Sequence, residues 1–296
     1  MNLAAPGSKS ILLGIACGIG ASVFWAGGLT AARHGIAVGL TPFDLAFHRY
    51  VWAGLVFLPS VLRQGVGNLN GIGWGRGISL ALLGGPGQAV VSASGFFLVP
   101  LAHGGVIQPS CAALAGLLLA TLVLHEKLPV VRIFGAIAIV AGVAVIGSEA
   151  FTTIGTHGLL GDFTFAFAGL MFAVFGMLLR MWRINPMRAT AIISALTLLY
   201  IPIHAVAFGF GHMIAAGWLE NAVQAVVQGI FSGPGAIYLF AKSVVLLGVS
   251  RAAVFPSLVP GLTLIVGFLA LAEVPSLLQL VGLAIVLVGF RLTQKA

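Results

Sequence analysis

The sequence predicts an all-α integral membrane protein, with ten transmembrane helices arranged as two inverted five-helix repeats around a central cavity. The prediction rests on an apolar composition, an alternation of positive charges along the chain, and a proline–glycine motif that returns half a chain later. Hydrophobic residues make up 60% of the chain and charged residues only 7%, against about 25% charged in a soluble domain. Most of the chain is therefore expected to lie in lipid, and its net charge of +8 does not indicate nucleic-acid binding.

Ten apolar runs approach or exceed the roughly 20 residues that cross a bilayer as a helix. The connections between these runs are short, so neighbouring helices are expected to pack as antiparallel hairpins without a soluble domain. We expect the first run to be a retained span, because no small-residue cleavage site follows a short apolar region. The predicted spans are 11–32, 43–62, 77–101, 106–124, 130–147, 158–180, 187–209, 221–247, 252–271 and 275–292.

The positive charges test this count independently. Arg33 lies in an odd-numbered loop, and Arg49 and Lys242 lie inside predicted spans. Because cytoplasmic loops are enriched in Lys and Arg, the pattern predicts that both termini are cytoplasmic. The other eleven of the 14 Lys and Arg residues fall at the termini or in even-numbered loops: Lys9, Arg63, Arg76, Lys127, Arg132, Arg180, Arg183, Arg188, Arg251, Arg291 and Lys295.

The second half of the chain repeats the first. The motif GGPGQA around Pro86 returns as SGPGAI around Pro234, 148 positions later. Residues 1–148 and 149–296 are therefore expected to form two repeats of five spans each. Because five is odd, the second repeat must enter the membrane upside down. Inverted repeats of this kind are typical of secondary transporters, which bind substrate near the midplane between the repeats.

Helix breakers recur inside the same apolar spans of both halves. Proline removes a helix hydrogen bond, and a membrane tolerates the freed carbonyl only against protein or a watery cavity. We interpret these residues as hinges at which helices bend when a gate opens, although close packing without motion is the alternative. The predicted hinge and gating residues are Pro86, Gly87, Pro109, Pro234, Gly235, Pro256 and Pro260.

Two hairpins carry a family resemblance. The stretches HEKLPVVRIFGAIAIVAGV at 125–143 and AEVPSLLQLVGLAIVLVGF at 272–290 resemble the EamA-type repeat of the drug/metabolite transporter superfamily. Trp25 and the FHRY stretch at 47–50 resemble the first-half pattern of that family, and the likeness covers the whole chain. The sequence is most similar to the YddG-type amino-acid exporters. The resemblance implies a ten-helix basket in the bacterial inner membrane that exports aromatic and other neutral amino acids.

Polar and aromatic residues inside the spans are the candidate binding residues, because polar groups in a membrane are costly. Gln88 and Ser92 are four residues apart and share one helical face, as do Tyr238 and Lys242. A snorkelling position is the alternative for Lys242. The predicted cavity residues are Trp25, His48, Gln88, Ser92, Gln108, Phe172, Tyr238, Lys242 and Ser257.

For several of these residues, a structural role is the alternative to substrate binding. Trp25 is equally consistent with an interfacial anchor, His48 with a packing histidine, and Phe172 with core packing. Arg49 is placed to pair with a substrate carboxylate or with Asp44, or to snorkel toward the outer face.

Features that the sequence lacks narrow the range of transport mechanisms. Asp44, Glu149, Asp162 and Glu220 all fall near the outer ends of spans. Coupled carriers usually need a carboxylate near the midplane, so facilitated export is favoured, with His48 as the remaining titrating candidate. No phosphate-binding loop is present to use ATP. Two isolated cysteines suggest neither a disulfide framework nor a metal site, and no cofactor is expected.

The expected partners are a small-molecule amino-acid substrate and the lipid bilayer. The alternatives are an exporter of drugs or other small metabolites, or a proton-coupled antiporter of the same fold. An intramembrane enzyme would need clustered His, Asp, Glu and Ser residues or metal ligands, and the seven histidines are scattered. We therefore predict a transporter and not an enzyme.

Overall fold

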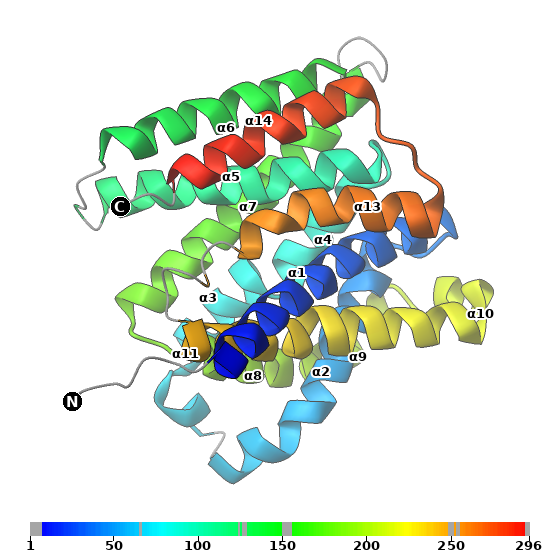
Figure 1. The fold of residues 1–296 in the computed structure, drawn as a ribbon. Helices are drawn as coiled ribbons and strands as arrows, with labels where there is room; N and C mark the ends of the chain where they lie inside the picture. Colours follow the sequence, from blue (N-terminus) through cyan, green and yellow to red (C-terminus); the bar gives the residue numbers. More distant parts are fainter. Residues whose placement is uncertain are drawn as a thin grey trace, which may run out of the picture.

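The computed structural model describes residues 8–64, 67–123, 125, 129–149, 156–247, 252 and 255–293. Every regular element within these residues is helical (Figure 1), so the all-α prediction is confirmed. The first half contains α1 (Ser8–Ala37), α2 (Pro42–Gln64), η1 (Leu69–Gly71), α3 (Trp74–Gly84), α4 (Pro86–Gly95), α5 (Leu101–Leu122) and α6 (Val130–Glu149).

The second half contains more breaks than the first. Its elements are α7 (Thr156–Met181), α8 (Pro186–Leu196), η3 (Thr197–Leu199), α9 (Tyr200–Ala207), α10 (Gly211–Gln224), η4 (Ala225–Gly235), α11 (Ala236–Leu247), η5 (Phe255–Leu258), α13 (Val259–Leu271) and α14 (Leu277–Thr293).

Helices occupy all ten predicted ranges, but not all are long enough to span a bilayer alone. Seven helical stretches of the described chain are long and apolar enough to cross a membrane: α1, α2, α5, α6, α7, the α8–α9 stretch and the α10–α11 stretch. The predicted third span is divided into α3 and α4, and α13 and α14 have 13 and 17 residues. The count of ten spans therefore stays a prediction.

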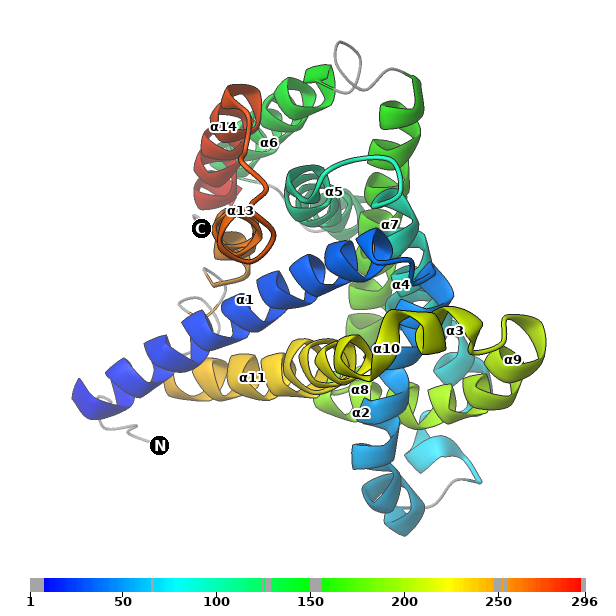
Figure 2. The same cartoon turned by 90° about the vertical axis from the view of Figure 1, so that its right-hand side faces the viewer.

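The last helix of each half packs against the other. In both cartoon views α6 and α14 lie side by side (Figures 1 and 2). A Cβ at Gly142 would lie 2.7 Å from the carbonyl oxygen of Gly282, and one at Gly135 would lie 2.8 Å from that of Gly289. Small residues allow this close backbone approach in membrane proteins. The two helices run in opposite directions, as inverted repeats require of equivalent helices.

Other helix contacts also recur when the halves are exchanged. Helix α5 packs on α7, and its counterpart α13 packs on α1. Helix α1 packs on α11, just as α7 packs on α3 and α4. Helix α1 consequently lies between α13 and α11, as both views show (Figures 1 and 2). This reciprocal packing is an approximate twofold relation between the halves.

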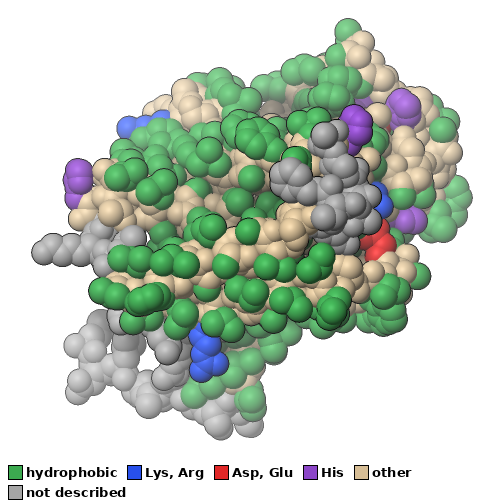
Figure 3. All heavy atoms as spheres, turned by 90° about the horizontal axis from the view of Figure 1, so that it is seen from above, with side chains coloured by type: hydrophobic (Ala, Val, Ile, Leu, Met, Phe, Trp, Pro, Cys, Tyr) green, Lys and Arg blue, Asp and Glu red, His purple; other side chains and the backbone are tan. Residues whose placement is uncertain are grey.

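The outer surface is apolar. The face seen from above is covered mainly by hydrophobic side chains, with few charged ones (Figure 3). Large side chains such as Val206, Trp218 and Val245 are 91%, 80% and 83% exposed. Contiguous apolar surface of this extent is stable only against lipid or a partner protein. Together with the seven apolar stretches, this surface identifies an integral membrane protein.

Candidate functional site

Two helices break at equivalent positions of the two halves. The chain leaves the helical conformation at Gly85 (φ −118°, ψ −140°) directly before Pro86, and at Gly233 (φ −83°, ψ −105°) directly before Pro234. A residue that precedes proline is disfavoured in the α conformation, because the proline ring crowds its backbone. The predicted spans 77–101 and 221–247 are thus interrupted at the helix breakers that the sequence shows there.

The second-half break follows a wide helical segment. η4 has π-helical hydrogen bonding, and its 11-residue range includes the non-helical Gly233. π-helical turns are rare, and they are frequent at functional sites. Its Gln228 and Ser232 are both 2% exposed. Arg49 of α2 donates through Nη1 to Oε1 of Gln228 at 3.1 Å and to Oγ of Ser232 at 3.4 Å. The wide segment therefore holds the guanidinium between the two halves.

The first-half break presents amide and hydroxyl groups. Gln88 and Ser92 lie on α4 just after the break and are buried. The Ser92 hydroxyl donates to Oε1 of Gln108 on α5 at 2.5 Å. The hydroxyl of Tyr50 donates to the Gly84 carbonyl at 3.1 Å, which satisfies a backbone acceptor beside the break. Of the predicted cavity residues, the structure brings together Gln88, Ser92 and Gln108.

Arg49, Gln88, Ser92, Gln108 and Gln228 line a cavity of about 40 Å³. Among the described residues that line it, Arg49 has the only charge, and the polar groups are three glutamines and one serine. The lining residues come from α1, α2, α4, α5 and η4: Gly28, Leu29, Ala32, Leu45, Arg49, Gln88, Ala89, Ser92, Ala93, Gln108 and Gln228. The arrangement suits an anionic group at Arg49 and neutral hydrogen-bonding groups opposite.

Other predicted residues lie elsewhere in this conformation. Trp25 is half-buried and packs against Phe240, with ring centroids 5.6 Å apart. Tyr238 is 56% exposed, and Nζ of Lys242 lies 5.9 Å from the centre of its ring. Neither member of this pair lines the cavity.

Two further candidates, Phe172 and Ser257, are also outside the cavity. Phe172 is 49% exposed, and its ring centroid lies 5.6 Å from that of Phe175. Ser257 lies in the short helix η5 and is half-buried. Neither lines the cavity in this conformation, so their binding roles stay predictions.

The predicted hinges lie in three different settings. Pro86 and Gly87 begin α4, while Pro234 and Gly235 end η4. Pro109 lies inside α5. Pro256 lies in η5 and Pro260 in the first turn of α13, where a missing N–H costs little.

His48 has the geometry of a packing histidine. It is fully buried, and its Nδ1 accepts a hydrogen bond from Nε1 of Trp52 at 3.0 Å. An indole N–H is a donor only, so the neutral imidazole has its proton on Nε2 and donates to Oδ1 of Asn221 at 3.0 Å. Both ring nitrogens are thereby occupied, which favours the packing alternative.

The sequence did not single out Gln228. The only available signal was its polarity within an apolar run, one turn before the second proline motif.

The structure also excludes one of the alternatives for Arg49. Asp44 is bound by Nε2 of His204 at 3.0 Å and by Thr41, and Arg49 reaches η4 instead.

One ion pair and three histidine–carboxylate contacts connect the two halves. Each of four pairs between described residues joins a member of 1–148 to a member of 149–296: Arg33–Glu273, His34–Glu220, His103–Asp162 and His204–Asp44. Within the described part of the chain no cluster of three or more His, Cys, Asp and Glu could hold a metal ion.

The sequence of each half matches the same family model. The EamA-like transporter family matches residues 12–148 and again residues 159–293. The chain belongs to the EamA-like transporter family. The EamA family contains transporters, so the protein is a membrane transporter of small molecules with two EamA repeats.

A solved structure supports the fold. The similar chain has a title that reads only "Crystal structure of protein". Its sequence is 20% identical to this one, the match covers 96% of each chain, and the TM-score is 0.64. At this identity the similarity shows the shared EamA fold and nothing further. No curated protein matches the sequence.

Proposed function

We propose that this EamA-family protein exports amino acids, aromatic and other neutral ones, from the cytoplasm by alternating access and without ATP. The proposal places it in the bacterial inner membrane with both termini cytoplasmic. The observation that supports it best is the single cation, Arg49, among neutral amides in a cavity between two broken helices. Transporters of this general design bind substrate at discontinuous helices near the midplane.

The chemistry of the lining fits an amino acid. A guanidinium binds a carboxylate through charge-assisted, often paired hydrogen bonds. The side-chain oxygens of Gln88, Gln108 and Gln228 are acceptors for an ammonium group. Leu29 and Leu45 supply apolar contacts for a neutral side chain. A carboxylate and an ammonium on one small molecule would thus both find partners.

The cavity must widen to take such a substrate. Its volume of about 40 Å³ is comparable to the roughly 30 Å³ that one water molecule occupies. Of the cavity residues, Gln88 lies three residues after the break at Gly85, and Gln228 lies five residues before the break at Gly233. Movement of the helices at these breaks is the simplest way to enlarge it, and alternate opening to each side would then carry substrate across.

Two alternative functions, an exporter of cationic drugs and a proton-coupled antiporter, fit the residues of the cavity less well. An exporter of cationic drugs would place a cation beside Arg49, which is repulsive in a low-dielectric site. A proton-coupled antiporter would need an acid that titrates during transport. The four described carboxylates that pair between the halves are held by Arg33 or by histidines, away from the cavity lining.

Counterflow in liposomes tests the proposal. Vesicles containing the protein are loaded with unlabelled L-tryptophan or L-threonine, and uptake of the labelled amino acid is measured with and without a pH gradient. We expect both amino acids to drive uptake, equally with and without the gradient. Tryptophanamide, which lacks the carboxylate, should not. Equal counterflow by tryptophanamide would refute recognition through Arg49, and dependence on the gradient would favour the antiporter.

A further inference from the structure

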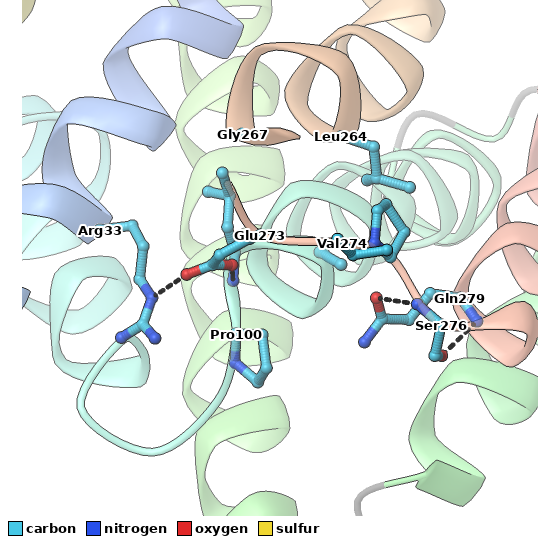
Figure 4. Close-up of a pocket in the computed structure, with 11 residues that line it drawn as sticks. Arg33, Pro100, Leu264, Gly267, Glu273, Val274, Ser276 and Gln279 are labelled. Carbon is cyan, nitrogen blue, oxygen red and sulfur yellow. Dashed lines mark hydrogen bonds and ion pairs between the residues drawn. The ribbon is translucent and has the colours of Figure 1, made fainter. Parts of the chain in front are cut away.

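A second pocket contains a cation and an anion in its wall. Its volume is about 330 Å³, against about 40 Å³ for the central cavity. Nε of Arg33 lies 2.8 Å from Oε1 of Glu273, and the two side chains point toward one another (Figure 4). These side chains are 26% and 29% exposed, so a small molecule can reach both charges.

This ion pair connects the two halves. Oε2 of Glu273 accepts a hydrogen bond from the backbone N–H of Leu101 at 3.0 Å. Nη1 of Arg33 donates to the carbonyl oxygen of Phe96 at 2.8 Å. Glu273 therefore binds the first half through both of its oxygens, at the end of α1 and at the start of α5. The halves cannot separate at this end until these bonds are exchanged for others.

The rest of the pocket wall is apolar or rigid. Leu264, Val274 and Pro275 line it beside the charges. The far rim is fixed by a capping box at the start of α14, in which Ser276 N–H donates to Oε1 of Gln279 at 3.1 Å and Gln279 N–H donates to Oγ of Ser276 at 3.2 Å. Opposite charges next to an apolar wall match a zwitterion with an apolar side chain.

The pocket and the central cavity share two helices. On α1, Ala32 lines the cavity and Arg33 lines the pocket. On α5, Gln108 lines the cavity and Ala102 lines the pocket. Val106, between these two positions, is fully buried. On α1 the charge of Arg33 thus directly follows the cavity residue Ala32, and on α5 the buried Val106 lies between the pocket and the cavity.

We propose that this pocket is a second substrate site, on the outer side of the transport path, for a zwitterionic amino acid. The substrate carboxylate replaces Glu273 on Arg33, and the substrate ammonium replaces Arg33 on Glu273. This exchange keeps both half-buried charges paired while it replaces the direct Arg33–Glu273 bond between the halves, so occupancy and opening of this end are coupled. The inference rests on the proposed amino-acid substrate and adds a site to it.

Protection of a single cysteine tests the second site without measuring transport. In a Cys17→Ser, Cys111→Ser background, Val274→Cys places a thiol on the pocket wall, where Val274 is 78% exposed. Leu277→Cys is the matched control, because Leu277 is 77% exposed and does not line the pocket. Labelling by a charged maleimide is followed with and without L-phenylalanine, phenylalaninamide or 3-phenylpropionate.

L-phenylalanine at ten times its Kd should slow labelling of Val274→Cys about tenfold by mass action. It should leave Leu277→Cys unchanged. The two analogues, each lacking one charge, should protect weakly. Glu273→Gln and Arg33→Gln should abolish the protection while the thiol stays reactive. Equal protection by either analogue, or protection that survives Glu273→Gln, would overturn the proposal.

The variant Arg49→Gln tests whether binding at the second site is independent of binding at the central cavity. We expect this variant to lose counterflow and to keep protection at Val274→Cys. Loss of protection as well would show that the central cavity controls labelling, and would overturn the second site. Counterflow by the unmutated carrier without protection would disprove the second site alone. Protection without amino-acid counterflow would instead disprove the proposed function and leave the pocket as a binding site.

Discussion

The two broken helices have the same Gly-Pro step but different surroundings. A Cβ at Gly85 would lie 2.4 Å from the carbonyl oxygen of Ala81 and 2.8 Å from Ile193. At the equivalent Gly233 the nearest atom beyond the adjacent turn of its own helix, the carbonyl oxygen of Gln228, would be 3.5 Å away. The first break is therefore closely packed, whereas the second has space and follows the π-helix that binds Arg49. The difference predicts that the second break moves more during transport.

Removal of the cation at the second break should have the largest effect. Arg49→Gln is expected to reduce amino-acid counterflow at least about 30-fold, from about 2 kcal/mol for a lost buried charge contact at 1.4 kcal/mol per tenfold. Arg49→Lys should retain part of the activity, because it keeps the charge without the paired donors. Arg63→Gln, at the exposed far end of α2, is the control. Normal transport by Arg49→Gln would contradict the proposed site.

Substitution of each glycine by alanine should show which of the two breaks is more tightly packed. Gly85→Ala is expected to destabilise the protein by about 2 kcal/mol, the usual cost of overpacking. Gly233→Ala should cost clearly less, because a methyl group there meets no side chain within 4 Å, whereas one at Gly85 meets Ile193 at 2.8 Å. Thermal melting followed by size-exclusion chromatography measures both variants. Equal melting temperatures would show that the two breaks are equally packed.

Alanine at the two prolines compares motion at the breaks. Pro234→Ala is expected to slow counterflow about fivefold, which corresponds to about 1 kcal/mol in the barrier. Pro86→Ala should slow it about twofold, a few tenths of a kcal/mol, since Pro86 begins α4 beside a tightly packed glycine. Expression should stay intact in both. A larger effect at Pro86 would reverse the assignment of the mobile break, and no effect at either would favour packing without motion.

The smallest expected effect is at the hydroxyl of α4. Ser92→Ala removes the hydrogen bond to Gln108, and water in the cavity can replace that donor. The half-saturation concentration in counterflow should rise about twofold, from about 0.5 kcal/mol for a neutral hydrogen bond. Ser79→Ala, at an exposed hydroxyl on α3, is the control. A tenfold rise would indicate that the substrate binds Ser92 directly.

Local patterns in the sequence were sufficient for the fold class and for part of the site. Long apolar runs locate the helices, because apolar length alone sets what a bilayer accepts. Gln88 and Ser92 could be predicted since they share a face of a regular helix and are exceptional in apolar surroundings. Gln108 was identified in the same way on the neighbouring helix.

The same reasoning placed Tyr238 and Lys242 in the cavity, where the structure does not put them. Their assignment rested on their four-residue spacing after Pro234, by analogy with Gln88 and Ser92 after Pro86. A π-helix has more residues in each turn, so the face that follows it is rotated relative to the α-helical expectation. Gln228, before the proline, takes the cavity position instead.

The Arg33–Glu273 pair had no sequence signal of this kind. Its partners are 240 residues apart, and the repeat at a shift of 148 residues does not relate these two positions. Arg33 appeared only as an exception to the alternation of charges. Contacts of this type depend on how the halves meet, which is a tertiary property.

The glycine contact between α6 and α14 bears on the ancestry of the protein. Gly135 meets Gly289 and Gly142 meets Gly282 through antiparallel backbones, so the surface of one repeat is complementary to its own flipped copy. A half-length polypeptide with this surface would dimerise with a copy inserted in the reverse orientation. Duplication and fusion of such a gene would make that assembly permanent, and would then free each copy to diverge toward a separate task.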